Sequence, residues 1–314
     1  MSGSLIVLVV LAVLPVVLVL AFAGCGLNAV GTYVPPAQTG QPPGQQPAQP
    51  PSGPGTGTPA TPPTAPVQYH DAVLADKPLV YWRLDEASGT TAKDSGTAKI
   101  DGTYAGGVTL GQIGALEPKD PDKAAAFDGK NGVMTVAYNM LLNPPAAASF
   151  SLECWIKPGG DPTGGGWQPT QFVAASRDAA GGKNFGFELV VIRDPDPNPR
   201  VLARIGDGVN PFQEVSVALP VGAEQTAWRH VVMSYIATAK TLTLWVTSVT
   251  DLKTNMSAPS SGVAYQPNPV NPFRVAAGGG GSPTGFFAGS VDEFALYNPA
   301  LPDSRVRPHF DASR

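Results

Sequence analysis

The first 69 residues contain no lysine, arginine, histidine, aspartate or glutamate. The 20 basic and 24 acidic residues of the 314-residue chain, which give it a formal net charge of −4, therefore all lie after this segment. A segment without any charged side chain cannot form the surface of an ordinary globular domain, because charged residues concentrate on such surfaces. We therefore expect the folded part of the protein to begin near residue 67.

Cysteine and histidine are also scarce. The chain has two cysteines, Cys25 and Cys154, and three scattered histidines. Two cysteines form neither a disulfide framework nor a zinc motif. Cys154 alternates with apolar residues, so we interpret it as a small buried side chain. His230 lies in a strand-like segment, where a histidine that bonds a neighbouring backbone group is expected rather than a catalytic or metal-binding one.

The sequence also lacks paired carboxylates and basic clusters. A glycosidase of the β-sandwich class needs two carboxylates that face one sugar, usually from one face of a strand. Prolines interrupt the nearest pair, Asp194 and Asp196, and the consecutive Asp292 and Glu293 would point to opposite faces of a regular strand. Basic residues are spread along the chain and balanced by acidic ones, which argues against nucleic-acid binding. We expect a protein that is not an enzyme.

Residues 5–23 form an almost continuous apolar run. At about 1.5 Å of rise per residue, a helix of this length covers most of a hydrocarbon layer about 30 Å thick. The run ends in the sequence AGCG, which is similar to the lipobox of bacterial lipoprotein signal peptides and implies a lipidated Cys25 as the mature N-terminus. The alternative is an uncleaved anchor helix, because no basic residue precedes the run. Both interpretations make residues 1–25 a signal or anchor of an exported, membrane-anchored protein on the extracellular or cell-envelope face.

Residues 26–66 are dominated by proline, glycine, glutamine, threonine and alanine. Such a segment has too few bulky apolar side chains to bury a core, so it is expected to be a disordered linker. We interpret it as a spacer that separates residues 67–314 from the membrane.

From residue 67 onwards, short apolar runs alternate with glycine, proline, asparagine and aspartate, which is typical of an antiparallel β-sandwich. Helical turns are indicated only at 69–76 and after residue 301. The expected strands are 79–84, 124–127, 133–136, 150–157, 172–176, 185–192, 201–205, 215–219, 228–235, 242–249, 273–276 and 286–297.

Two of these strands place a tryptophan on the face opposite the core. In 150–157 the apolar residues alternate with Trp155, and in 242–249 they alternate with Trp245. Each tryptophan could serve as a platform for a ligand or belong to a second layer of the core.

Several motifs follow one another in an order that resembles bacterial laminin-G-like domains of the concanavalin A-like superfamily. The motifs are YHDAVLADKPLVYWRLDE from residue 69, TAKDSG from 91, GTY from 102, AFDG from 126, FSLECWIK from 150, WRHVV from 228, TLTLWV from 241 and FAGSVDEFALYNPAL from 287. The resemblance implies an all-β jelly-roll sandwich of two antiparallel sheets over residues 67–314. It also implies a carbohydrate- or protein-binding, adhesive role.

The resemblance further implies one structural calcium ion, which needs six to eight oxygen ligands. The candidate ligands are Glu86, Asp94, Asp128 and Asp292, with Asp94 and Asp292 brought together by adjacent strands. The alternative is that Asp94 and Asp128 cap glycine turns by side-chain hydrogen bonds.

The sequence therefore predicts a non-catalytic, surface-anchored module that binds a glycan or a cell-surface protein. The aromatic residues expected to be exposed for this purpose are Trp155, Trp167, Trp245 and Tyr265. A structural domain of an envelope or particle assembly without a small ligand is the main alternative. A glycoside hydrolase is the third.

Overall fold

The computed structural model describes residues 68–159, 170–192, 199–220 and 226–314. The proposed lipidation site Cys25, the linker 26–66 and Trp167 lie outside these ranges. None of the described helices is long and apolar enough to cross a membrane.

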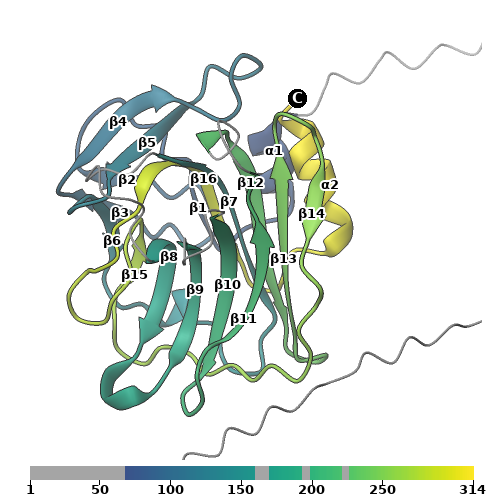
Figure 1. The fold of residues 1–314 in the computed structure, drawn as a ribbon. Coiled ribbons are helices and arrows are strands. Elements are labelled where there is room, and N and C mark those ends of the chain that lie inside the picture. Colours follow the sequence, from purple (N-terminus) through teal and green to yellow (C-terminus); the bar gives the residue numbers. More distant parts are fainter. Residues whose placement is uncertain (1–67, 160–169, 193–198, 221–225) are drawn as a thin grey trace, which may run out of the picture. The chain divides into compact units, whose positions relative to one another are not determined.

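Two eight-stranded sheets, both antiparallel, make up the domain (Figure 1). In the first, here called sheet A, the order is β14-β13-β12-β7-β16-β5-β4, and β1 also pairs with β16. In the second, sheet B, the order is β11-β10-β9-β8-β15-β6-β3-β2. The predicted all-β sandwich is therefore confirmed.

The strands of sheet A are β1 (Val80–Trp82), β4 (Val108–Ile113), β5 (Lys123–Asp128), β7 (Phe150–Pro158), β12 (Arg229–Ile236), β13 (Thr241–Ser248), β14 (Thr254–Met256) and β16 (Ala288–Tyr297). Those of sheet B are β2 (Thr91–Ala92), β3 (Gly102–Ala105), β6 (Val133–Val136), β8 (Thr170–Asp178), β9 (Phe185–Ile192), β10 (Arg200–Asp207), β11 (Gln213–Ala218) and β15 (Phe273–Val275). The helices are α1 (Tyr69–Ala75), α2 (Asp303–Ala312) and the short 3-10 turns η1 (Met140–Leu142) and η2 (Ala180–Gly182).

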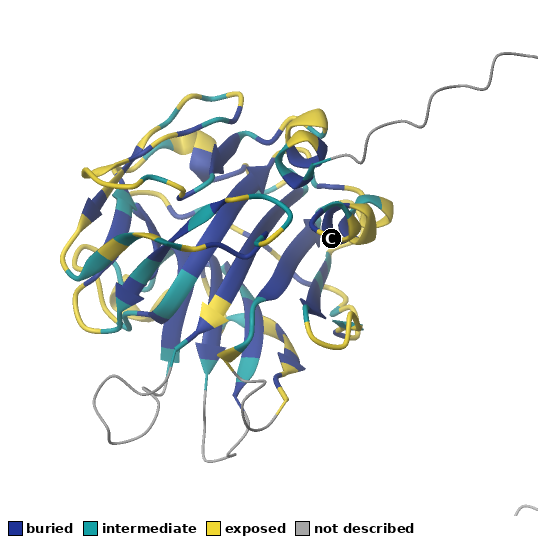
Figure 2. Cartoon of the chain, turned by 90° about the horizontal axis from the view of Figure 1, so that it is seen from above, coloured by how far each residue is buried: buried dark blue, intermediate teal, exposed yellow. Residues whose placement is uncertain are grey.

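The main core lies between the two sheets. Strand β7 shows how the sequence builds it, because alternate residues from Phe150 to Ile156 point inward and Cys154 among them is a free, buried thiol. Across the core, the ring of Phe150 lies 5.0 Å from that of Phe187 in sheet B. Figure 2 shows that buried residues occupy the strands, whereas exposed residues gather on loops and on the outer sides of the helices.

A second core lies on the outer face of sheet A, where α1 and α2 pack (Figure 1). It includes Trp155 and Trp245, which are only 0% and 8% exposed, together with Phe310 of α2. The two tryptophans thus belong to a second layer of the core. Their expected exposure is wrong because strand periodicity identifies a face but does not show whether helices cover it.

Tyr265 is also buried, contrary to the sequence prediction. Its ring packs 5.0 Å from that of Phe150 and 5.8 Å from that of Tyr235, and 2% of its surface is exposed. Its neighbours in the sequence are a mixture of polar residues and proline, which gave no sign that this loop returns to the main core.

The aromatic contacts between the sheets predict the cost of removing one ring. Replacing Phe187 with alanine should lower the free energy of unfolding by about 3–5 kcal/mol, because a fully buried ring leaves a cavity that the sandwich cannot close. Urea denaturation measures this change. The control Val209→Ala, at a side chain that is 80% exposed, should change stability by less than about 0.5 kcal/mol. Equal losses in the two variants would contradict the assignment of Phe187 to the core.

Candidate functional site

Strand β16 contains an irregularity that brings two consecutive carboxylates together. Its pairing with β7 shifts register between Asp292 and Ala295, and Glu293 has a φ of 51°, in the left-handed region. One carboxylate oxygen of Asp292, one of Glu293 and one of Asp122 lie within 4.8 Å of one another. The expectation that Asp292 and Glu293 face opposite ways is wrong, because it assumed a regular strand.

The three side chains form a buried acidic cluster, defined as Asp122, Asp292 and Glu293. Arg83 holds two of them, with Nε 3.1 Å from Glu293 Oε1 and Nη2 3.0 Å from Asp122 Oδ1. The backbone N–H of Ala115 donates to Asp292 Oδ2 at 2.8 Å. The second oxygen of each carboxylate is buried without a hydrogen-bond partner among the described residues.

The surroundings of the acidic cluster disfavour the ionised form of its three carboxyl groups. Burial raises the pKa of Glu293 well above its usual range, and burial together with the neighbouring Asp122 does the same for Asp292. Burial also raises the pKa of Asp122 to about 6, although the adjacent Asp292 carboxyl and the charge of Arg83 oppose the increase. The cluster therefore favours an added positive charge, either bound protons or a cation with a preference for oxygen ligands.

The other predicted metal ligands do not belong to this cluster. Asp94 accepts hydrogen bonds from the backbone N–H groups of Tyr81, Gly96 and Ile100 at 2.6–2.8 Å, which is the geometry of a turn cap. The expected meeting of Asp94 with Asp292 as ligands is therefore wrong.

Asp128 and Glu86 are likewise engaged elsewhere. Asp128 Oδ1 accepts from the N–H groups of residues 130–132, and Glu86 accepts from Lys93 N and from the hydroxyl of Tyr104. Of the four predicted ligands, Asp292 alone lies in the acidic cluster. Asp122 was missed because it comes 170 residues before Asp292 in the sequence, and Glu293 because of the bulge.

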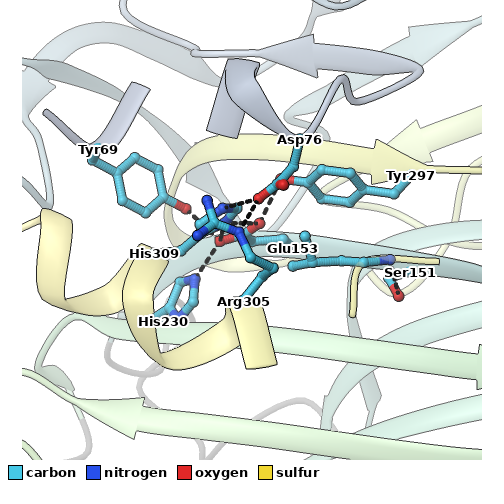
Figure 3. Close-up of polar contacts among 9 residues, drawn as sticks. Tyr69, Asp76, Ser151, Glu153, His230, Tyr297, Arg305 and His309 are labelled. Atoms are coloured by element: carbon cyan, nitrogen blue, oxygen red, sulfur yellow. Dashed lines mark hydrogen bonds and ion pairs between the residues drawn. The ribbon is translucent and has the colours of Figure 1, made fainter. Parts of the chain in front are cut away.

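A second polar cluster surrounds Glu153, whose side chain points from β7 into the space beneath α1 and α2 (Figure 3). Its Oε1 accepts from Tyr69 at 2.9 Å and from His230 Nε2 at 2.6 Å, and its Oε2 accepts from Tyr297 at 2.7 Å. His309 Nδ1 lies 3.0 Å from both oxygens. We call these five residues the Glu153 network.

Positive charge and hydrogen bonds stabilise the ionised form of Glu153. Burial alone would raise its pKa, but the charge of His309 and the hydrogen bonds from His230 and His309 hold it well below its usual range. In turn, burial works to lower the pKa of His309, and Glu153 and Asp76 outweigh it, so this pKa is raised. His230 bonds this carboxylate and not a backbone group, which corrects the sequence prediction.

The outer face of sheet B carries a third arrangement of charged and aromatic residues. The guanidinium of Arg177 lies 5.5 Å from the ring centre of Phe172 and 5.0 Å from that of Phe212. Its Nη1 is 2.8 Å from Oε1 of the buried Glu188. Burial raises the pKa of Glu188, although the charges of Arg177 and Arg204 oppose the increase.

The Glu153 network predicts a large effect of neutralising its centre. Glu153→Gln should lower the free energy of unfolding by about 3–5 kcal/mol, because it leaves the buried His309 without one of its two counter-charges. Chemical denaturation at pH 6 measures the loss. The control Glu214→Gln removes a half-exposed carboxylate paired with Arg204 and should cost under about 1 kcal/mol. A similar small effect at Glu153 would contradict its central role.

Comparison with known proteins agrees with the sequence resemblance. A family model described as the concanavalin A-like lectin/glucanases superfamily matches residues 128–307, more than half of the chain. No curated protein matches the sequence.

Solved structures are similar at low identity. The binding domain of Paraclostridial mosquitocidal protein 1 is 14% identical, with a TM-score of 0.54 over 76% of this chain and 53% of that one. The binding domain of botulinum neurotoxin serotype G is 9% identical, with a TM-score of 0.51 over 74% of this chain and 51% of that one. The chain thus spans about half the length of either structure, and the likeness concerns the fold. From the match to the family model and the two-sheet architecture, the chain belongs to the concanavalin A-like lectin/glucanases superfamily.

Proposed function

We propose that the protein is a non-catalytic binding module that recognises carbohydrate through the outer face of sheet B. The observation that carries this proposal is the placement of Arg177 between two aromatic rings on that face. Sugars present apolar ring faces and many hydroxyl groups, which aromatic side chains and charged hydrogen-bonding groups recognise together. The two similar solved structures are both named as binding domains, which supports a binding role.

The two sheets differ in how accessible their outer faces are. Helices α1 and α2 cover the outer face of sheet A and bury the tryptophans there. Within the described ranges, no helix packs in this way on sheet B. Arg177 keeps 17% of its side chain exposed, and Phe212 is partly exposed beside it. Sheet B is therefore the better candidate for a ligand face.

The carboxylates of the domain support a binding role over glycoside hydrolysis. Hydrolysis needs two carboxylates that reach the scissile bond from a cleft. The acidic cluster has suitable spacing, but its three side chains are buried, and Arg83 is bonded to two of them. A sugar therefore cannot reach the carboxylates of the acidic cluster unless the domain opens.

The acidic cluster fits a structural cation such as calcium. Its donors are hard carboxylate oxygens, and one oxygen of each carboxylate has no partner among the described residues. Asp122, Asp292 and Glu293 would hold the ion and would join β16 to the loop that precedes β5. The ion would supply positive charge that stabilises the bulge and would take no part in ligand chemistry.

Presentation at the cell surface is part of the proposal. The apolar run at 5–23, with or without lipidation of Cys25, would anchor the chain, and the uncharged linker would carry the domain away from the membrane. A cell-surface glycan or a glycoprotein is then the expected partner.

A packing domain in an envelope or particle is the alternative function. It would be favoured by one broad apolar surface. The large exposed apolar side chains of the described residues instead come from several segments, among them Ile113 of β4, Met140 of η1, Val209, Met256 of β14 and Val270.

The proposed ligand face predicts a specific effect on glycan binding. Arg177→Ala should abolish binding to a glycan that the full-length wild-type chain retains on a glycan array. The control Arg307→Ala removes another arginine that lies over a phenylalanine ring, on helix α2, and should leave binding unchanged. Loss in both variants, or in neither, would contradict the assignment of the ligand to sheet B.

The proposed cation predicts a calcium-dependent rise in melting temperature. Adding excess calcium to the metal-stripped protein should raise the melting temperature by several degrees, since a ligand that binds only the folded state stabilises it. Asp292→Asn should remove this rise. The control Asp128→Asn, at a carboxylate that caps a turn, should retain it. If wild-type protein shows no rise, the cluster holds protons and the cation proposal fails.

A further inference from the structure

His309 contacts a carboxylate with each of its two ring nitrogens. Nδ1 lies 3.0 Å from both oxygens of Glu153, and Nε2 lies 2.7 Å from Oδ2 of Asp76. A neutral imidazole has a single N–H, so it could donate to only one of these carboxylates and would present a lone pair to the other. The doubly protonated imidazolium satisfies this geometry, because it donates to both carboxylates at once.

These contacts join parts of the chain that are far apart in sequence. Asp76 ends α1, His309 lies on α2, and Glu153 is in the middle of sheet A. Arg305 of α2 also contacts Asp76 at 2.7 Å, and Tyr69 of α1 donates to Glu153. His309 thus contacts both the end of α1 and the sheet, beside the separate Arg305–Asp76 and Tyr69–Glu153 bonds.

The surrounding groups contact one or the other of these carboxylates, whereas His309 contacts both. Arg305 bonds Asp76 from the solvent side, with 35% of its side chain exposed. The remaining groups that face Glu153 are Tyr69, Tyr297 and His230, each of which donates a single hydrogen bond. If His309 lost its proton, either Glu153 or Asp76 would face a lone pair at hydrogen-bond distance.

We propose that α1 and α2 form a pH-sensitive cover over the outer face of sheet A, which protonated His309 holds closed and which loosens when His309 loses its proton. Opening uncovers Trp155, which stacks on Phe310 of α2 at 5.7 Å, and the edge of Trp245. This device is independent of carbohydrate binding on sheet B.

The direction of the pH dependence follows from thermodynamic linkage. The raised pKa of His309 means that its contribution to stability is complete below its ordinary pKa of 6.5 and is lost as the pH rises through the raised value. The lowered pKa of Glu153 gives a contribution that is present above its ordinary pKa of 4.5 and is lost in stronger acid. The cover is therefore held best between these two ordinary values and opens on the alkaline side.

Hydrogen exchange of the full-length chain in detergent, followed by mass spectrometry from pH 6 to pH 9, tests the proposal. After correction for intrinsic exchange rates, protection in α1 and α2 should fall by up to about tenfold per pH unit above the pKa of His309, since one proton is lost. Protection in β9 of sheet B should stay constant. Constant protection of α2, or a parallel loss in β9, would overturn the proposal.

Two variants assign the effect to a residue. His309→Gln should expose α2 at every pH and remove the pH-dependent step. The control His70→Gln removes a histidine of α1 that contacts Asp71 and Asp120 and lies outside the Glu153 network. This variant should keep the wild-type profile. Persistence of the step in His309→Gln, or its loss in His70→Gln, would reject His309 as the group responsible. If His309→Gln does not fold, the wild-type profile still decides whether a cover exists.

Discussion

A single buried carboxylate, Glu153, determines how the outer face of sheet A is closed. An isolated charge in this position would be very costly to bury, so it persists only because other groups surround it. The donors come from α1, α2, β12 and β16, and each of these elements must be in place for the charge to be compensated. The same requirement joins α1 and α2, the first and last elements of the described sandwich.

The tryptophans on this face follow from that constraint. Once α1 and α2 are held over sheet A, Trp155 and Trp245 lie beneath them and add apolar burial to a layer centred on charged groups. The large apolar rings provide most of the non-directional stabilisation, whereas the Glu153 network selects one position for the helices. The outer face of the other sheet has no such helical cover among the described residues, and Arg177 remains partly exposed there.

The sequence was sufficient to predict the fold because the fold depends on alternation and turns. The inward residues of β7 and β13 have period two, and the two helices lie where the strand pattern stops. The candidate sites were harder to predict because they depend on departures from that pattern. The bulge at Glu293 reverses the face that periodicity assigns, and nothing local shows that Asp122 meets it.

The period of a strand identifies the face on which a residue lies, but it does not show whether another layer covers that face. Trp155 was correctly placed opposite the main core, but alternation alone cannot distinguish a solvent-facing side from one beneath a helical layer. The sequence did contain one usable signal, because Glu153 lies two positions before Trp155 on the same strand face. A carboxylate beside a large aromatic ring needs either water or a set of hydrogen-bond donors. Here His230, His309 and two tyrosines are those partners.

The two carboxylate clusters on sheet A differ in how many of their carboxylate oxygens have hydrogen-bond partners. This difference distinguishes a purely structural network from a candidate binding site. In the Glu153 network both oxygens have donors at hydrogen-bond distance, so the arrangement is complete without a further ligand. In the acidic cluster three buried oxygens lack partners in the described part of the chain, at a cost of about 1–3 kcal/mol or more for each. Three residues of β16 separate Glu293 from Tyr297, so one strand serves both clusters, and its strained bulge lies beside the cluster whose oxygens lack partners. The left-handed backbone of Glu293 and the buried oxygens without partners thus occur at the same place in the strand, which is where strained backbone and functional sites tend to coincide.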